Sequence, residues 1–185
     1  MMDVAQDAPT TVILAEDEAS LYLQATVLAV WAAQGQTPVV RADPSRVKTN
    51  FYGTLNLQTG QELALQTPKL NAQTTAQYLE QILLAYPERP ILLFWDRAPW
   101  HQGAAIRRVL EANPRLEIMR FPVAAPELNP QEHVWKATRG AISHNHTQAH
   151  LPELAAQFEQ HLTSTTFESS FLDRYGYNAI LPMFN

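Results

Sequence analysis

The stretch Pro90-Ile91-Leu92-Leu93-Phe94-Trp95-Asp96-Arg97-Ala98-Pro99-Trp100-His101 decides the fold that this chain is expected to adopt. Its five consecutive apolar residues, with a proline before them and Ala-Pro after, predict a strand buried on both faces. Such a strand lies in the middle of a sheet that has helices above and below it. Asp96 follows at the carboxyl end, where open α/β sheets place their chemistry. Taken alone, Asp96 is explained equally well as a cap of the following turn.

A second acidic segment repeats this pattern near the start of the chain. The apolar run 11–15 leads into Glu16-Asp17-Glu18 and predicts another buried strand that delivers acids. Because side chains alternate along a strand, Asp17 points to the face opposite Glu16 and Glu18. At most one or two of these acids can therefore point at a shared site. We expect Asp17 to do so and Glu16 to point away.

The third acid, Glu132, lies in Leu128-Asn129-Pro130-Gln131-Glu132-His133-Val134-Trp135. Asn129 suits an N-cap and Pro130 suits the first helical position, which puts Glu132 at the third. A glutamate there can simply reach back to the cap as a capping box. Lys136 and Arg139 follow on the same helix face, which suits a metal-plus-phosphate surface or, equally, a solvated salt-bridged helix.

The remaining segments predict a mixed α/β sheet with helices on both faces, within one domain. Further strands are expected over 20–30, 47–57, 62–67 and 116–121, with 47–57 and 62–67 forming a hairpin. Helices are expected over 71–85 with Asn71 as N-cap, 103–111, 131–141 and 151–162. No repeat or linker marks a second domain. We treat 1–185 as a single domain, with a core of about 11–145 and a C-terminal helix and tail over 146–185.

Composition narrows the class of protein. Of 185 residues, 46% are hydrophobic and 17% charged, as in a globular protein, and no cysteine is present for disulfides or thiolate-bound zinc. A net charge of -5 argues against an ordinary basic nucleic-acid-binding protein. It leaves open a catalytic domain that acts on nucleic acid, because clustered carboxylates lower the net charge. No signal pattern or long apolar run is present, so a soluble, cytoplasmic protein without a membrane partner is expected.

Three carboxylates at two strand ends and one helix start are what a two-metal phosphoryl-transfer site needs. Hard divalent ions such as Mg²⁺ prefer oxygen ligands. Two such ions, about 4 Å apart, can hold the attacking and leaving oxygens of an in-line displacement. We therefore expect the carboxylates of Asp17, Asp96 and Glu132 to lie within metal-bridging reach of one another.

Four motifs in matching order give the chain a resemblance to a known family. They are Asp17-Glu18-Ala19-Ser20, Trp31 with Gly35-Gln36-Thr37-Pro38, Asp96-Arg97-Ala98-Pro99-Trp100-His101, and the run from Pro126 to Trp135. Together they resemble the Asp-Asp-Glu transposase catalytic domain of the mariner superfamily, in its bacterial insertion-sequence branch. The resemblance covers about 12–145 and implies a ribonuclease-H-like fold with a mixed five-stranded sheet. It implies Asp17, Asp96 and Glu132 as the catalytic and metal-binding acids, with Mg²⁺ or Mn²⁺, two ions, as cofactor.

Two features depart from the pattern of that family. Arg97 stands where the family usually has asparagine, which adds a cation beside the second acid. The spacing from Asp96 to Glu132 is 132 − 96 = 36 positions, one more than usual in this branch. Both departures leave all three acids in place.

Several other residues are candidates for DNA binding or for supporting the metal ligands. These are Glu18, Arg97, His101, Lys136 and Arg139, and we expect Arg97 and Lys136 to contact phosphate. His101 could orient a metal-bound water or a phosphate, or could only order its loop. Trp31, Trp95, Trp100 and Trp135 are interpreted as core or loop anchors.

The resemblance implies DNA as the substrate, both transposon ends and target, and a homodimer as the assembly. Family members read their ends through helix-turn-helix modules placed before the catalytic domain. About ten residues precede the first expected strand, and the 13 Lys and Arg are scattered along the chain. We therefore expect weak, unselective DNA binding, with a separate or upstream helix-turn-helix segment supplying specificity. The alternatives are a ribonuclease-H-like nuclease or resolvase without strand transfer, and a non-catalytic remnant that only binds DNA or a partner.

Overall fold

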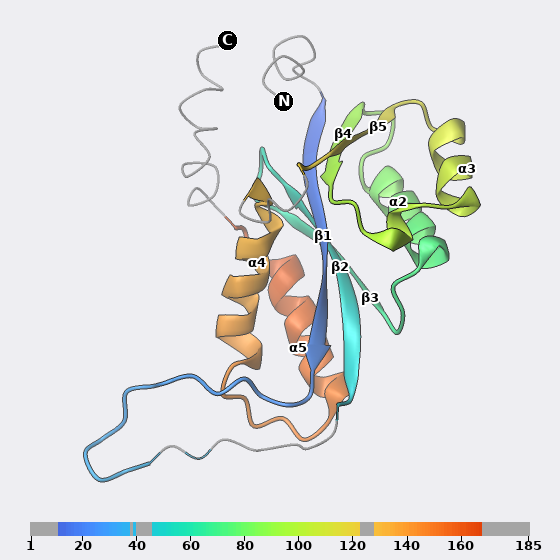
Figure 1. Cartoon of the computed structure of the whole chain (residues 1–185). Helices are drawn as coiled ribbons and strands as arrows, with labels where there is room; N and C mark the ends of the chain where they lie inside the picture. Colours follow the sequence, from blue (N-terminus) through green and yellow to red (C-terminus); the bar gives the residue numbers. More distant parts are fainter. Residues whose placement is uncertain (1–10, 38, 40–45, 123–127, 168–185) are drawn as a thin grey trace.

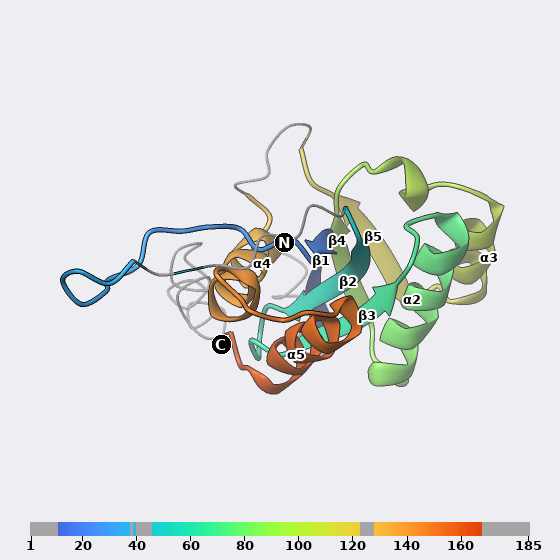
Figure 2. The same cartoon turned by 90° about the horizontal axis from the view of Figure 1, so that it is seen from below.

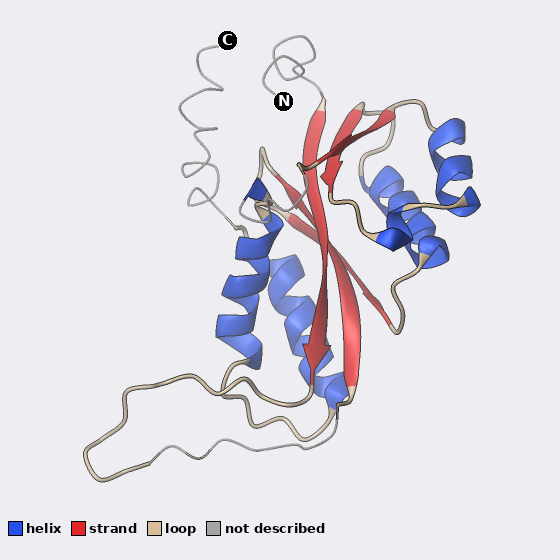
Figure 3. Cartoon of the chain, viewed as in Figure 1, coloured by secondary structure: helices blue, strands red, loops and turns tan. Residues whose placement is uncertain are grey.

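A five-stranded mixed sheet forms the centre of the computed structural model, which describes residues 11–37, 39, 46–122 and 128–167 (Figures 1 and 3). The strands are β1 (Val12–Tyr22), β2 (Lys48–Asn56), β3 (Glu62–Thr67), β4 (Ile91–Trp95) and β5 (Leu116–Arg120). Their order in the sheet is β3-β2-β1-β4-β5. β1 pairs antiparallel with β2 and parallel with β4, so the two predicted acid-bearing strands are neighbours.

The strand predicted over 20–30 is wrong. The chain instead continues β1 through Tyr22, because Ser20 and Tyr22 pair with Asn50 and Lys48 at the start of β2. Beyond this point the side chains are mostly exposed, and the backbone is tied by a bond from the Leu23 N–H to the Val47 carbonyl and by an isolated bridge between Thr26 and His144. Apolar composition alone does not make a strand where no neighbouring strand accepts its hydrogen bonds.

One face of the sheet is covered by α2 (Ala72–Ala85) and α3 (Ala104–Ala112). The apolar layer between these helices and the sheet includes Leu14, Leu93 and Ile82. The predicted N-cap of α2 is confirmed: Asn71 accepts from the backbone N–H groups of Gln73 and Thr74, as part of a capping box. All five residues of β4 are buried, as its uninterrupted apolar run predicted.

The other face is covered by α4 (Gln131–Thr138) and α5 (Leu151–Ser164), as Figure 2 shows from below. Phe51, Trp135 and Phe158 are buried in the layer that these helices share with the sheet. The helix predicted over 131–141 ends its α-helical part at Thr138 and continues as a π-helical turn, η3 (Arg139–Ser143). A mixed sheet with helices on both faces is therefore confirmed.

The connection after β1 extends away from the sheet over 23–37 (Figure 1). Asn145 ties its start to the segment after α4, since its side chain bonds both the N–H and the carbonyl of Leu28. The expectation that Trp31 anchors a core or loop is wrong, because this side chain is fully exposed, whereas Trp95 and Trp135 are buried. Of the C-terminal helix and tail expected over 146–185, residues 168–185 lie outside the described residues. Within the described part, none of the helices is long and apolar enough to cross a membrane.

Candidate active site

Two of the three predicted acids are brought level with each other by the pairing of β1 with β4. The last paired residues of these parallel strands are Ala15 and Phe94, and Asp17 and Asp96 each come two positions later. Asp17 lies within β1, whereas Asp96 directly follows the end of β4. The two acids therefore lie at the same edge of the parallel part of the sheet, as predicted from their positions after apolar runs.

Asp17 is held by the helix that carries the third acid. The indole N–H of Trp135, three residues after Glu132 on α4, donates a hydrogen bond of 3.1 Å to Asp17 Oδ2. Burial, and next the charge of Glu18, raise the pKa of Asp17 to about 7, and the charge of Glu132 adds to this rise. Glu132 itself is exposed on the first turn of α4. The negative charge of Glu132 therefore acts on Asp17.

The start of α4 differs by one residue from the prediction. The helix begins at Gln131 with Pro130 at the cap, so Glu132 is the second helical residue, and no side chain caps the helix. The capping-box explanation of Glu132 is therefore wrong. Asn129 nevertheless serves the helix start, because its Oδ1 accepts from Gln131 N at 3.1 Å. Its amide Nδ2 donates to the carbonyl of Glu16 at 3.2 Å and thereby ties α4 to β1.

A buried acid that the sequence did not single out fixes the same end of α4. Glu62, at the start of β3, accepts a hydrogen bond from the side-chain amide of Gln131, and both side chains are buried. Burial raises the pKa of Glu62 well above its usual range, although the bonds from Gln131 and from the Thr54 backbone oppose the rise. Gly53, which pairs with Asp17 across the sheet, leaves the space that Gln131, Trp135 and Glu62 occupy.

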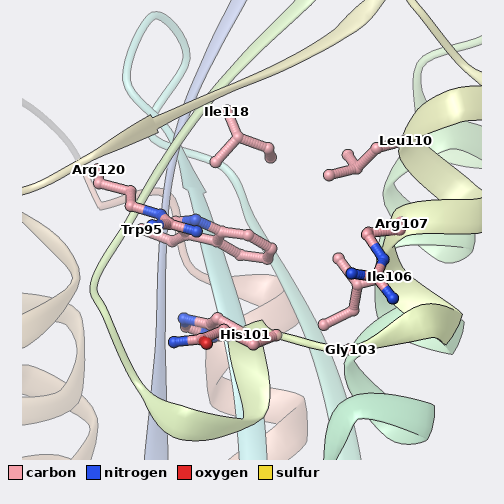
Figure 4. Close-up of a pocket in the computed structure, with 9 residues that line it drawn as sticks. Trp95, His101, Gly103, Ile106, Arg107, Leu110, Ile118 and Arg120 are labelled. Carbon is pink, nitrogen blue, oxygen red and sulfur yellow. The ribbon is translucent and has the colours of Figure 1, made fainter.

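Asp96 is held by His101, which lies on the short 3-10 turn η1 (Pro99–His101) (Figure 4). The Nδ1 atom of His101 is 3.0 Å from Asp96 Oδ1, and its Nε2 atom is 2.9 Å from Glu18 Oε1 and 3.4 Å from Glu16 Oε2. The imidazole also stacks on Trp95, with ring centroids 4.3 Å apart. One histidine therefore connects the second predicted acid to the two acids on the opposite face of β1 from Asp17.

These contacts favour the imidazolium form of His101. Neutral histidine has one N–H donor and one acceptor nitrogen, yet both of its nitrogens face carboxylates here. Burial alone lowers the pKa of His101, but its hydrogen bonds to Asp96 and Glu18 and the charges of Glu16 and Glu18 outweigh this and raise it to about 10. The same bond, together with one from the backbone N–H of Ala98, lowers the pKa of Asp96.

The three predicted acids are not the tightest set of possible metal ligands in this structure, and their shared metal site stays a prediction. In the described part of the chain, the set whose possible ligand atoms all lie within 4.8 Å of one another is Glu16, Glu18 and His101, rather than Asp17, Asp96 and Glu132. Like charges repel, and His101 offers Asp96 a cationic partner on the other side. Glu16 was expected to point away from the site, but it lies in the cluster that contacts Asp96 through His101.

Strand alternation itself is confirmed, because Glu16 and Glu18 share His101 whereas Asp17 contacts Trp135 on the opposite face. Glu16 is almost fully buried, and neither of its carboxylate oxygens has a hydrogen-bond partner among the described residues. Burial and the charge of Glu18 raise its pKa well above its usual range. His101 and Glu18, expected as supporting residues, are therefore in contact with the predicted acids.

The predicted cations have no comparable contacts. Arg97 and Lys136 are exposed and Arg139 is half-buried, and none of the three forms an ion pair within the described residues. Glu62, Gln131 and Gly53 were missed because nothing in their local sequence shows that β3 and α4 meet. Asp96 and His101 are five positions apart, and that spacing was the available signal for their contact.

Comparisons with known proteins agree with this geometry. The sequence model of one family, described as DDE superfamily endonuclease, matches residues 12–155. A Shigella sonnei protein, the insertion element IS630 uncharacterized 39 kDa protein, is 25% identical over 132 residues, which are 71% of this chain and 38% of that protein.

Among solved structures, the mariner Mos1 paired end complex with Mg has a TM-score of 0.65 at 17% identity, over 92% of this chain and 53% of that chain. The catalytic domain of Mos1 mariner transposase has a TM-score of 0.59 at 15% identity, over 93% of this chain and 78% of that chain. At this identity the likeness shows the fold, and it confirms the ribonuclease-H-like prediction. The chain spans about half the length of the Mos1 complex chain, and less of the insertion-element protein.

Proposed function

The chain belongs to the DDE superfamily endonucleases, and from this premise we propose that it is the catalytic domain of a transposase that cuts and joins DNA strands. The observation that carries the proposal is the placement of the three acids. β1 and β4 bring Asp17 and Asp96 level at one sheet edge, and Trp135 anchors the helix that carries Glu132 to Asp17. Three carboxylates on these elements suit phosphoryl transfer.

The donor set fits a divalent metal of the hard class. The ligands that these residues offer are carboxylate oxygens, which Mg²⁺ and Mn²⁺ prefer. Burial and then the charges of Glu18 and Glu132 raise the pKa of Asp17, and a bound cation would favour its charged form. We propose that Asp17, Asp96 and Glu132 hold two Mg²⁺ or Mn²⁺ ions. Structures of Mos1, which has a similar fold, contain Mg or Mn, and this supports the proposed choice of metal by analogy.

The tighter set of Glu16, Glu18 and His101 could hold an ion by distance alone, but its chemistry argues against this. Both nitrogens of His101 already lie within hydrogen-bonding distance of carboxylates, and in the imidazolium form neither has a lone pair to give to a metal. We therefore assign His101 to orienting Asp96, and Glu18 to fixing His101. When bound, divalent ions supply Lewis acidity at the scissile phosphate. The protein positions the three carboxylates relative to one another at the edge of the sheet.

The exposed cations around the acids are proposed to contact the DNA backbone. Arg97 is next to Asp96, and Lys136 and Arg139 follow Glu132 along α4. Guanidinium and ammonium groups at such positions bind phosphate without reading sequence. We expect the substrates to be transposon ends and target DNA.

The rest of the assembly is also a proposal. Since the chain covers 38% of its insertion-element relative, recognition of the ends is assigned to a separate or upstream helix-turn-helix segment. A homodimer is supported by the connection after β1, where Val27, Leu28, Val30 and Trp31 expose apolar surface. The bacterial origin of that relative supports a cytoplasmic location in bacteria.

The test is cleavage of supercoiled plasmid by the purified chain with Mg²⁺ or Mn²⁺. Wild type should nick the plasmid, whereas Asp96→Ala, Asp17→Asn and Glu132→Gln should not, and the exposed acid Glu111 supplies a matched control as Glu111→Gln. Nicking by all variants would contradict the assignment of the acids. Nicking by none, wild type included, would favour the remnant that only binds DNA or a partner.

A second substrate separates transposase from nuclease. An oligonucleotide with a pre-cut 3′-hydroxyl end should become joined to plasmid if the chain performs strand transfer. Nicking without joining would favour the ribonuclease-H-like nuclease or resolvase.

A further inference from the structure

A pocket of about 450 Å³, drawn in Figure 4, includes His101, the residue that contacts Asp96. It is formed between the end of β4, helix α3 and strand β5, and His101 is part of its wall. The buried side chains of Trp95 and Ile106 line its interior. Arg107, from α3, and Arg120, from β5, lie on opposite sides of it in Figure 4. His101 is thus shared between this pocket and Asp96.

The polar groups that line the pocket are mostly hydrogen-bond donors. The residues around it include two arginines and no aspartate or glutamate. Neither Arg107 nor Arg120 forms an ion pair in the part of the chain that is described. Two guanidinium groups without an ion pair among the described residues, on a wall that carries no carboxylate, favour an anionic ligand.

The placement of arginines in this part of the chain departs from the acidic character of the whole. Five arginines occur between positions 97 and 120 of a chain whose net charge is -5. Arg115 is used within the fold, since it donates to the carbonyls of Leu83, Tyr86 and Arg89. Arg97, Arg107, Arg108 and Arg120 are exposed. Of these, Arg107 and Arg120 are brought to one pocket, which the expectation of scattered cations did not foresee.

We propose that this pocket binds a phosphodiester group of the DNA substrate, clamped between the guanidinium groups of Arg107 and Arg120. The proposal rests on the proposed function and adds a site to it. The pocket is larger than one phosphate needs, and the partly buried apolar side chains of Leu110 and Ile118 on its wall suit an adjoining sugar. A phosphate held here would fix the DNA next to Asp96 through the shared wall at His101.

The site supplies position and not sequence recognition. Guanidinium groups grip two phosphate oxygens in a fixed fork, which sets the orientation of the backbone. A DNA strand whose phosphate is held in this pocket would approach Asp96 from the side of α3. Contacts to phosphate of this kind are independent of base sequence.

The experiment compares neighbouring arginines of one helix. Arg107 lines this pocket, whereas Arg108 lines a different hollow against α2, so Arg107→Gln and Arg108→Gln form a matched pair. Binding of a fluorescent random-sequence duplex is measured by anisotropy in EDTA at several salt concentrations, for wild type, these variants, Arg120→Gln and the Arg107→Gln/Arg120→Gln double variant. Far-UV circular dichroism checks that each variant folds.

The double variant should bind on the order of tenfold more weakly at low salt. The slope of log K against log salt should become less steep by about one, since one phosphate contact releases about 0.9 counterion. Arg108→Gln should behave as wild type, and Arg107→Lys/Arg120→Lys should recover part of the affinity. An unchanged slope in the double variant, or an equal loss with Arg108→Gln, overturns the site.

Two further outcomes separate this site from the proposed function. If wild type nicks plasmid while the double variant keeps the wild-type salt slope, the pocket assignment fails and the endonuclease stands. If wild type neither binds nor nicks DNA, both fail. Tight calorimetric binding of inorganic phosphate that the double variant abolishes, with DNA binding unaffected, would identify a small-anion site and overturn the DNA assignment.

Discussion

The indole N–H of Trp135 donates to the carboxylate of Asp17 at 3.1 Å, across 118 positions of sequence. This bond joins α4 to β1, and thus the helix that carries Glu132 to the strand that carries the first acid. A second bond, from the Gln131 amide to Glu62, anchors the same helix to β3 four residues earlier. Two polar contacts on one helix face therefore set the register of α4 against the sheet.

The position of α4 on the sheet is predicted to be sensitive to substitution of Gly53. A Cβ atom there would overlap the Gln131 amide, the Trp135 ring and the Glu62 carboxylate. We expect Gly53→Ala to destabilise the fold by about 1–3 kcal/mol, as overpacking does, and to reduce nicking by displacing Trp135 from Asp17. Gly140→Ala is the control, because a Cβ at that position meets nothing within 4 Å. Urea unfolding and the plasmid assay measure both effects; wild-type values for Gly53→Ala would contradict this packing.

Trp135→Phe should shift the pH dependence of activity. Phenylalanine keeps an aromatic ring but removes the N–H donor, and that hydrogen bond lowers the pKa of Asp17. Without it the pKa rises further above 7, so Asp17 stays protonated, and a poor metal ligand, to a higher pH. The acid-side midpoint of the pH–rate profile for nicking should therefore move upward relative to wild type. A midpoint that stays in place would show that Asp17 does not control the acid limb.

His101→Gln should destabilise the protein and should do so most below neutral pH. The folded-state pKa of His101 is raised from 6.5 to about 10, so its contribution is fully present below pH 6.5 and is lost as pH rises through 10. Removing one partner of a buried charge cluster costs about 3–5 kcal/mol. We expect a loss near this range at pH 6 that shrinks between pH 6.5 and 10, measured by urea unfolding. A loss independent of pH would indicate that only the stacking on Trp95 matters.

Glu62→Gln should make the free energy of unfolding less dependent on pH above pH 4.5. The folded-state pKa of Glu62 is raised well above 4.5, so its contribution is present below 4.5 and is lost as pH rises through the folded pKa. Within that window wild type should lose up to about 1.4 kcal/mol per pH unit relative to Glu62→Gln. Urea unfolding of both proteins at pH 5, 7 and 9 checks the difference. Parallel stability curves would show that Glu62 does not bind its proton more tightly in the folded state.

Much of this fold is determined locally and could be read from the sequence. The apolar run before Asp96 predicted a strand with helices on both sides, and Asn71 predicted the start of α2, because burial on two faces and capping leave a local pattern. Alternation along 16–18 correctly separated Asp17 from Glu16 and Glu18. The order of acids and motifs also led to the family that the chain belongs to.

Tertiary structure alone decided which partner each acid takes. His101 draws Asp96 toward Glu18 and Glu16, and Gly53 makes room for Trp135 and Gln131, although these residues come from strands and helices far apart in the chain. The extent of β1 was likewise set by its pairing with β2 and not by the apolar residues that follow it. Periodicity records which side of an element is buried. The charges, donors and vacant space that meet that side come from other elements, so they appear only when the elements pack.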